Sequence, residues 1–252
     1  DRKWAPIPYR IFDAEEIGEA FRLMQTAGHI GKIVVRPPVL AGRRLARPAT
    51  RPFTPGDGVQ LIVGGTGGFG FATAGWLIEK GATHVVVASR SGAVAEVDAA
   101  TVAKWRSEGV DVRVETVDAT DLASVEGLIA RVVAGMGPVT GVFLTAMVLD
   151  DGLICDLEAD RVARVLAPKI DGAIHLDRAT RGQPIERFVL YSSATALVGN
   201  PGQAAYVAAN AFLQGLARRR RAEGLPALAV AWGAIADVGV LAREEATAKK
   251  LE

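Results

Sequence analysis

The chain has 252 residues, half of them hydrophobic, a formal net charge of +1 and a single cysteine, Cys155. This composition is sufficient for a sizeable core, and neither a nucleic-acid-binding surface nor a membrane-spanning segment is expected from it. One cysteine excludes an internal disulfide and fits a reducing cytoplasm, and the widely separated His29, His84 and His175 give no indication of a metal site.

Residues 1–37 form a small N-terminal unit, with a helix-like stretch around Ala14–Ala27 and an apolar strand at Lys32–Val35. Residues 38–57 are rich in Arg, Pro, Gly and Thr and lack periodicity, which is typical of a linker. We therefore expect three parts: the unit 1–37, the linker 38–57 and a larger domain over 58–252. Because the chain does not begin with Met, we also expect it to be a segment of a longer protein.

Short apolar runs alternate with helix-like stretches from Val59 onward. This alternation predicts an α/β fold with a doubly wound parallel sheet, Rossmann-like, in the strand order 3-2-1-4-5-6. The predicted strands are Val59–Val63, His84–Ala88, Val110–Glu115, Gly141–Ala146, Phe188–Ser192 and Ala227–Ala231. The predicted helices are Phe71–Lys80, Ala95–Ser107, Leu122–Gly135, Glu158–Thr180 and Ala204–Glu223.

A glycine-rich turn, VGGTGGFG at residues 63–70, follows the first of these strands. Gly65, Gly67 and Gly70 fit the G-x-G-x-x-G dinucleotide fingerprint, in which glycine allows close approach of a pyrophosphate to a helix N-terminus. Taken alone, the glycines are also compatible with an ordinary connection between a strand and a helix. The absence of a following Gly-Lys-Ser/Thr argues against phosphate-loop NTPase chemistry.

The residue after the second strand distinguishes the two nicotinamide cofactors. An NAD-binding enzyme usually places Asp or Glu at this point, where it bonds the ribose 2′-hydroxyl. This chain instead has Ser89 and Arg90, and Arg90 lies twenty residues after Gly70. Since an arginine there accommodates a 2′-phosphate, the sequence predicts NADP(H).

Ligands of such sheets bind beyond the carboxyl ends of the strands, so residues there are further candidates. Asp118, after the third strand, is equally compatible with a bond to the adenine of a cofactor and with a cap of the helix that begins at Leu122. The predicted cofactor contacts are Gly64, Gly65, Thr66, Gly67, Gly68, Phe69, Gly70, Ser89, Arg90, Ser91, Asp118, Ala119, Ala146, Lys169, Tyr191, Ser192, Tyr206 and Gly233.

Four side chains are candidate catalytic residues. Ser193 ends the fifth strand, Tyr206 follows thirteen residues later, and Asn210 lies one helical turn beyond Tyr206 on the same face. Lys169 lies in the preceding helix. Each alone is ordinary, because a tyrosine on a half-buried helix more often packs than catalyses. Their common position, at the sheet edge of the predicted nicotinamide site, makes them candidates.

From these residues, the chain resembles the ketoreductase domains of animal-type fatty acid synthases and reducing polyketide synthases, in the short-chain dehydrogenase/reductase superfamily. Asn210 stands where simple members carry the lysine of Tyr-x-x-x-Lys, and Lys169 replaces it, as is typical of these synthases. The matching stretches are GGTGGFG (64–70), ASRSG (88–92), VDATD (117–121), FLTAMVLDDG (143–152), LAPKIDGAIHLDRAT (166–180), FVLYSSATALVGNPGQAAYVAANAF (188–212) and GLPALAVAWGAIADVGV (224–240).

The resemblance implies an oxidoreductase that uses NADPH to reduce a β-ketoacyl thioester, carried on acyl carrier protein, to the (3R)-β-hydroxyacyl thioester during polyketide or fatty acid elongation. Tyr206 would donate its proton to the developing alkoxide, and Ser193 would hydrogen-bond the same oxygen. Lys169 would orient the nicotinamide ribose and lower the pKa of Tyr206, and Asn210 would support this network.

Two features within the resemblance concern specificity. Leu149, Asp150 and Asp151 resemble the Leu-Asp-Asp motif of ketoreductases that give the D (3R) alcohol, and Val198 stands where the opposite class usually has Trp. A turn cap remains the alternative for the two aspartates. Met147, where family members often have Gly, resembles fatty acid and mycocerosic-acid-type synthases and is expected to add bulk to the floor of the cofactor site.

Residues 1–37 resemble the carboxyl-terminal tail of a medium-chain enoyl reductase. The implied partners are acyl carrier protein and other domains of one megasynthase: enoyl reductase, dehydratase and a structural reductase-like subdomain. Family domains usually continue past Ala242 into a helical segment that covers the substrate, so we expect this chain to bind cofactor and to hold substrate poorly. A non-catalytic reductase-like module and a free-standing sugar or alcohol dehydrogenase remain alternatives.

Overall fold

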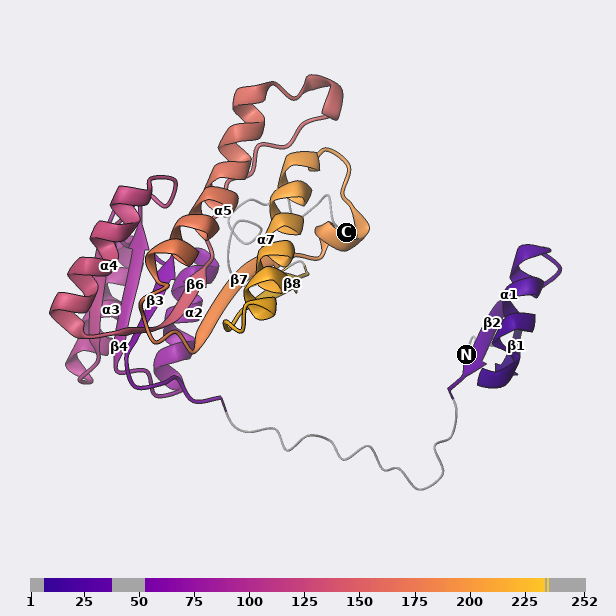
Figure 1. The fold of residues 1–252 in the computed structure, drawn as a ribbon, viewed down its shortest axis with the longest axis horizontal. Coiled ribbons are helices and arrows are strands. Elements are labelled where there is room, and N and C mark those ends of the chain that lie inside the picture. Colours follow the sequence, from indigo (N-terminus) through magenta and orange to yellow (C-terminus); the bar gives the residue numbers. More distant parts are fainter. Residues whose placement is uncertain (1–6, 38–52, 234, 236–252) are drawn as a thin grey trace, which may run out of the picture. The chain divides into compact units, whose positions relative to one another are not determined.

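The structure, a computed structural model, describes residues 7–37, 53–233 and 235 (Figure 1). The chain divides into two compact units, Asp1–Pro52 and Phe53–Glu252, which we call units 1 and 2. Phe53 already belongs to unit 2, because its ring stacks on Trp76 at 4.5 Å and Arg187 donates to the Thr54 carbonyl at 2.6 Å. The predicted linker therefore ends before Phe53, and residues 38–52 lie outside the described residues.

Unit 1 is a small βαβ unit. Its elements are β1 (Tyr9–Asp13), the 3-10 helix η1 (Ala14–Glu16), α1 (Ile17–Gln25) and β2 (Lys32–Arg36), and the two strands pair in parallel. The predicted helix and strand are confirmed, whereas β1 was not predicted because its five residues include two charged ones. Phe12 and Ala20 are buried, but Tyr9, Phe21 and Met24 are exposed. A two-stranded sheet with so small a core is marginal on its own.

Unit 2 is built on a six-stranded parallel sheet in the order β5-β4-β3-β6-β7-β8, which confirms the predicted order (Figure 1). Its strands are β3 (Val59–Val63), β4 (His84–Ser89), β5 (Asp111–Thr116), β6 (Val139–Leu144), β7 (Arg187–Ser193) and β8 (Leu228–Trp232). Its helices are α2 (Gly68–Glu79), α3 (Glu96–Ser107), α4 (Leu122–Met136), the 3-10 helix η2 (Ile154–Asp156), α5 (Ala159–Ala179), α6 (Thr195–Val198) and α7 (Ala204–Ala222).

The element ends differ from prediction mainly beside the glycine-rich turn. β6 ends at Leu144, two residues earlier than predicted, because the amides of Thr145 and Ala146 both turn to the carbonyl of Val63 at the end of β3. α2 begins at Gly68, inside the fingerprint. The short helix α6 was not predicted, since four residues are too few for a helical period.

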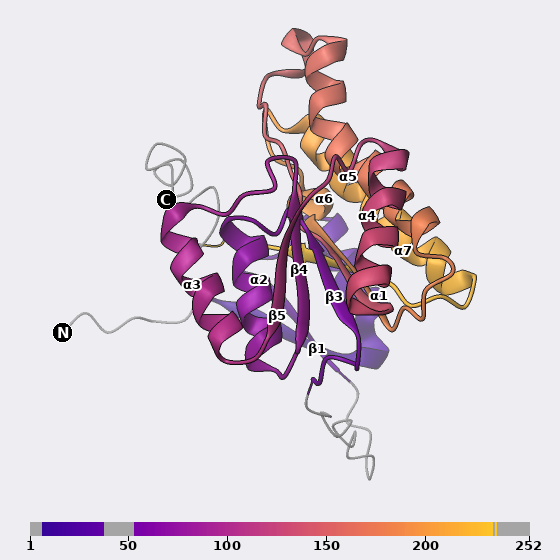
Figure 2. The ribbon, with the colours of Figure 1, turned by 90° about the vertical axis from the view of Figure 1, so that its left-hand side faces the viewer.

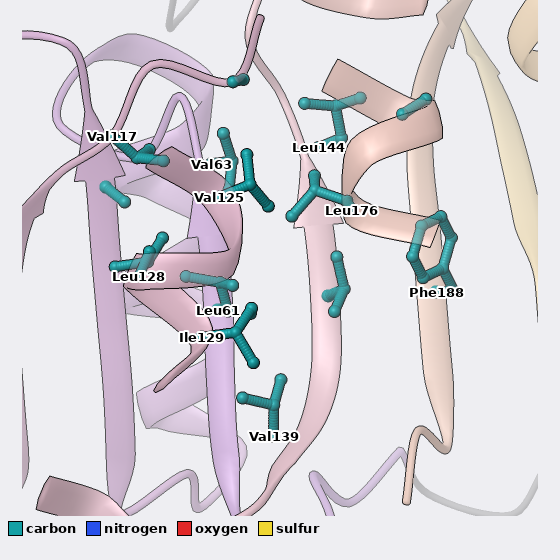
Figure 3. Packing of buried hydrophobic residues seen from close by; sticks show 14 of the residues in the cluster. Leu61, Val63, Val117, Val125, Leu128, Ile129, Val139, Leu144, Leu176 and Phe188 are labelled. Atoms are coloured by element: carbon teal, nitrogen blue, oxygen red, sulfur yellow. The ribbon is translucent and has the colours of Figure 1, made fainter. Parts of the chain in front are cut away.

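One face of the sheet is covered by α4, α5 and α7. Leu61 and Val63 of β3 point into this layer, where they join Leu128 of α4, Leu176 of α5 and Leu213 of α7 in one buried cluster. Figure 3 shows this packing from close by, with side chains of α4 and α5 beside those of β3 and β6. Alternate residues of a strand point to opposite faces of the sheet, so this cluster contains about every second residue of the central strands.

The opposite face is covered by α2 and α3, as the turned view in Figure 2 shows. Ile62 of β3, Leu77 of α2 and Val87 of β4 form the second buried cluster, against which Trp105 of α3 packs. Burial of β3 and β6 on both faces explains their near-continuous apolar sequences. No helix among the described residues has the length and apolar character needed to cross a bilayer.

A buried ion cluster joins α5 to α7. Asp177 of α5 accepts hydrogen bonds from Arg220, from Arg181 at 3.0 Å and from Arg219 at 2.9 Å. Arg220 is 2% exposed, and its guanidinium lies 3.9 Å from the centre of the Phe188 ring. A buried guanidinium needs such a partner, because an isolated buried charge is strongly unfavourable.

Candidate active site

A cavity of about 350 Å³ lies at the carboxyl edge of the sheet, between the ends of β3, β4, β5 and β6. This is the edge at which ligands of doubly wound sheets bind. The residues that line it are Val63, Gly64, Gly67, Gly68, Phe69, Gly70, Ser89, Arg90, Val117, Asp118, Ala119, Thr120, Thr145, Ala146, Met147, Val148 and Pro168. Ten of the predicted cofactor contacts are in this set, and Met147 lies in the cavity wall as expected.

The glycine-rich turn can be formed only with glycine at its tightest points. Gly64 has a φ of +88°, and a Cβ there would lie 2.5 Å from the amide nitrogen of Ala146. A Cβ on Gly70 would lie 2.3 Å from the Gly64 carbonyl oxygen and 2.6 Å from the Thr145 hydroxyl. The first turn of α2 therefore approaches the end of β3 closely. Gly68, Phe69 and Gly70 of this turn line the cavity, and a helix N-terminus at a cavity wall is the arrangement that binds a pyrophosphate.

Arg90 and Asp118 lie at the rim of this cavity. Arg90 is exposed, and Ser89 and Ser91 beside it hydrogen-bond each other at 3.1 Å. The pKa of Asp118 is lowered by hydrogen bonds from Thr120 and, more weakly, by the charge of Arg90. Asp121 caps α4, since its side chain accepts from Ala123. Asp118 is therefore not the helix cap, and it lies in the cavity wall with its Oδ1 bonded to Thr120.

Eight predicted cofactor contacts are not among the lining residues: Lys169 and Tyr206, which are described below, and Gly65, Thr66, Ser91, Tyr191, Ser192 and Gly233. The Tyr191 hydroxyl bonds Thr73 of α2 at 2.9 Å, and its ring meets Phe69 and Trp232 edge-on or tilted. The buried Ser192 hydroxyl donates to the Asn210 carbonyl at 3.0 Å. Tyr191 and Ser192 thus join elements around the site, and their contact with a cofactor stays a prediction.

Lys169 is directed at the end of β7. It is 2% exposed, follows the cavity-lining Pro168, and its Nζ donates to the backbone oxygen of Tyr191 at 2.7 Å. The same Nζ lies 5.7 Å from the centre of the Tyr206 ring. Burial lowers the pKa of Lys169 to about 8, so the ammonium is still mostly protonated at pH 7.

Tyr206 is half-buried near the start of α7. Burial raises the pKa of Tyr206, although hydrogen bonding to Asn210 and Ser193 lowers it in part and the charge of Asp151 raises it further. Desolvation of the phenol outweighs these hydrogen bonds, and the lowering of this pKa by Lys169 stays a prediction. A phenol that holds its proton at neutral pH is suited to act as a proton donor.

Ser193 and Asn210 complete the predicted set around Tyr206. Ser193 Oγ accepts from the amide of Thr195 at 3.2 Å and from its hydroxyl at 2.9 Å. Asn210 is fully buried, and its Nδ2 donates to the backbone oxygen of Tyr206 at 2.8 Å, while its Oδ1 finds no hydrogen-bond partner among the described residues. The structure therefore brings all four candidate catalytic residues to one place.

The loop that contains Leu149, Asp150 and Asp151 is hydrogen-bonded to α5 and to Gln203, the residue directly before α7. Asp150 accepts from Arg161 of α5 at 2.7 and 3.0 Å and from Arg164 at 2.7 Å, and these bonds lower its pKa to about 2. Asp151 accepts from Gln203 at 2.9 Å, three residues before Tyr206. Asp150 is therefore held by two ion pairs and Asp151 by a hydrogen bond from the Gln203 side-chain amide, rather than either capping a turn.

Sequence reasoning missed the partners of these residues. Thr145 closes the turn over Val63, Thr195 bonds Ser193, and Arg161 bonds Asp150. The unusual residues at 144–147 were a signal for Thr145, since they depart from the family pattern. No sequence signal pointed to Thr195 or Arg161, because a serine or an aspartate can take hydrogen-bond partners from any neighbouring element.

The comparisons with known proteins agree with this geometry. The family model of the KR domain matches residues 58–237. One of the proteins that make up the phenolphthiocerol/phthiocerol polyketide synthase of Mycobacterium tuberculosis is 40% identical over 240 residues, which are 95% of this chain and 11% of that protein. The chain thus spans about a tenth of the length of that curated relative.

Two solved structures are similar over most of the chain. The ketoreductase from the first module of phoslactomycin biosynthesis in a Streptomyces species is 38% identical with a TM-score of 0.74, and the match covers 80% of this chain and 46% of that one. A structure described as A-type ketoreductases from a modular polyketide synthase is 40% identical with a TM-score of 0.66, over 69% of this chain and 37% of that one.

Proposed function

The chain belongs to the KR domain family, the ketoreductases of polyketide synthases, and from this premise we propose that it reduces a β-ketoacyl thioester held on acyl carrier protein to the (3R)-β-hydroxyacyl thioester. The observation that carries the proposal is the convergence of Tyr206, Ser193 and Lys169 beside a glycine-lined cavity. A purely structural module has no need of a buried lysine next to such a cavity, nor of a half-buried phenol beside that lysine.

The cavity fits a phosphorylated nicotinamide dinucleotide. Gly64, Gly67, Gly68 and Gly70 line the cavity without side chains of their own, so a pyrophosphate can approach the backbone at the start of α2. Arg90 at the rim suits a 2′-phosphate, and Asp118 suits the adenine end. When bound, NADPH supplies the hydride that reduces the carbonyl carbon of the substrate.

The residues of the chain supply the proton and the charge stabilisation. As the carbonyl carbon gains its hydride, the carbonyl oxygen gains negative charge, and the Tyr206 phenol gives this oxygen its proton. Ser193 hydrogen-bonds the same oxygen. The Lys169 ammonium, 5.7 Å from the Tyr206 ring, stabilises the phenolate that remains. The reverse oxidation would need this phenolate at the start, and burial disfavours it, so reduction is the easier direction at neutral pH.

The test is a reductase assay on the full-length protein that carries these residues. With NADPH and a β-ketoacyl thioester, we expect NADPH oxidation and a product that chiral chromatography identifies as the 3R alcohol. The Leu149–Asp151 loop supports this configuration, and a 3S product would contradict it. Binding of NADPH without turnover would instead support the alternative, a non-catalytic cofactor-binding module.

Replacing Arg90 by aspartate tests the choice of cofactor. We expect the preference for NADPH over NADH, measured as the ratio of their kcat/KM values, to fall by about tenfold or more, because a charge-assisted contact with the 2′-phosphate is lost. The matched control is Arg178→Asp, which removes another exposed arginine, on α5 and outside the cavity lining. An unchanged ratio in Arg90→Asp would refute the 2′-phosphate contact.

The proposal extends to the identity of unit 1 and to the partner domains of this chain. We propose that unit 1 is the end of a medium-chain enoyl reductase domain, and that this domain, a dehydratase, a structural reductase-like subdomain and acyl carrier protein share one cytoplasmic megasynthase. The exposed Tyr9, Phe21 and Met24 support this, since apolar side chains on both layers of a βαβ unit are normally covered. A full-length structure that leaves these side chains in solvent would contradict it.

A further inference from the structure

The Ser193 hydroxyl is held by a single neighbouring residue. Thr195 directs both its backbone amide, at 3.2 Å, and its side-chain hydroxyl, at 2.9 Å, to Ser193 Oγ. A serine hydroxyl has one proton to donate and two lone pairs that accept. Both lone pairs of Ser193 are therefore occupied by Thr195, and the one remaining direction around Oγ is that of its own proton.

The backbone bond and the side-chain bond have different origins. A serine that accepts from the amide two residues later forms an ordinary turn, and valine or alanine at position 195 would preserve it. The turn is further fixed to β8, because the amide of Ala194 donates to the Trp232 carbonyl at 2.8 Å. The Thr195 hydroxyl is thus not needed to form the turn, and its bond to Ser193 is an addition to it.

The direction of the Ser193 proton matters for the proposed reduction, on which this inference rests. Ser193 is one of the neighbours that lower the pKa of Tyr206, and it therefore favours the phenolate form of that residue. If a lone pair of Ser193 were free, the Tyr206 proton could be shared with Ser193 instead of being directed to the substrate. With both lone pairs filled, Ser193 can only donate, either to the phenolate or to the developing alkoxide.

We infer that Thr195 is a positioning residue for the reduction, which fixes Ser193 as a hydrogen-bond donor. Thr195 touches neither cavity nor phenol in the described structure, and it acts through Ser193. The same argument predicts that residue 195 keeps its role only while it carries a hydroxyl, so serine replaces threonine and valine does not.

The test compares Thr195→Val with Thr195→Ser in the full-length protein. Valine has the shape of threonine without its hydroxyl, and we expect kcat to fall by about two- to twelvefold, the effect of one neutral hydrogen bond. The KM for NADPH should not change, and Thr195→Ser should restore kcat. Thermal unfolding checks that each variant is folded, and Thr195→Ala removes the hydroxyl without crowding if valine is not tolerated.

A double-mutant cycle with Ser193→Ala separates positioning from a general structural effect. If Thr195 acts through Ser193, Thr195→Val causes no further loss of kcat once Ser193 is alanine. An equal loss in both backgrounds, or a Thr195→Val variant as active as the parent, would overturn the inference. Its failure is distinguishable from failure of the proposed function, which Tyr206→Phe tests independently of residue 195.

Discussion

Replacing Tyr206 by phenylalanine should lower kcat for ketone reduction by about 10²–10⁴-fold, the usual contribution of a positioned proton donor. Phenylalanine retains the ring that lies 5.7 Å from the Lys169 ammonium, so packing around the site is preserved. NADPH binding should change little, because the cavity is lined by other residues. Single-turnover NADPH oxidation and a fluorescence titration with NADPH measure the two effects separately.

The matched control for this experiment is Tyr9→Phe. This substitution removes the same hydroxyl group from a tyrosine that lies exposed on β1 in unit 1. The kcat of the Tyr9→Phe variant should equal that of the parent protein. A Tyr206→Phe variant that reduces the ketone at the parent rate would rule out the phenol as the proton donor, and with it the proposed mechanism.

The largest expected effect on stability comes from Asp177→Asn. Removing this carboxylate leaves the Arg220 guanidinium, which is 2% exposed, without its charged partner. Breaking a buried ion pair in this way costs about 3–5 kcal/mol of the free energy of unfolding. Urea unfolding followed by tryptophan fluorescence measures the change, and a loss below about 1 kcal/mol would place the pair among weak surface contacts.

The matched control for Asp177→Asn is a variant of an ion pair at the surface. Asp111→Asn breaks a half-exposed pair with Arg113 and should cost less than about 1 kcal/mol.

Burial alone would raise the pKa of Asp177, but hydrogen bonds from Arg181 and the charge of Arg220 lower it overall. The stability that this carboxylate contributes is therefore present at neutral pH and is lost as pH falls through that lowered pKa. The Asp177→Asn variant should lose less stability over this acidic range.

The sequence allowed the sheet and its cofactor edge to be predicted because both depend on local patterns. β3 and β6 are buried on both faces and so read as continuous apolar runs, and the glycines from Gly64 to Gly70 are required by backbone geometry. Arg90 could be predicted to lie at the cofactor edge of the sheet because it directly follows a strand. Each of these features is decided by residues within a few positions of one another.

The contacts that tune the site could not be predicted in this way. Lys169 donates to the backbone oxygen of Tyr191, which lies 22 residues along the chain and carries no sequence signal as an acceptor. The pKa of Tyr206 rises because of burial, and burial depends on how α7 packs against the sheet. β1 was missed because its pairing with β2 crosses a helix and its own five residues lack an apolar run.

The loop at Leu149–Asp151 has a consequence for protein engineering. Asp150 is held by Arg161 and Arg164, Asp151 is held by Gln203, and the amide of Gly152 donates to the Gly202 carbonyl at 2.8 Å. A graft of the tripeptide alone into another reductase would transfer two carboxylates without the cations and the amide that orient them. If the tripeptide sets the alcohol configuration as proposed, transfer of that configuration to another scaffold would require the tripeptide, the first two turns of α5 and the segment before Tyr206 to be moved as one cassette.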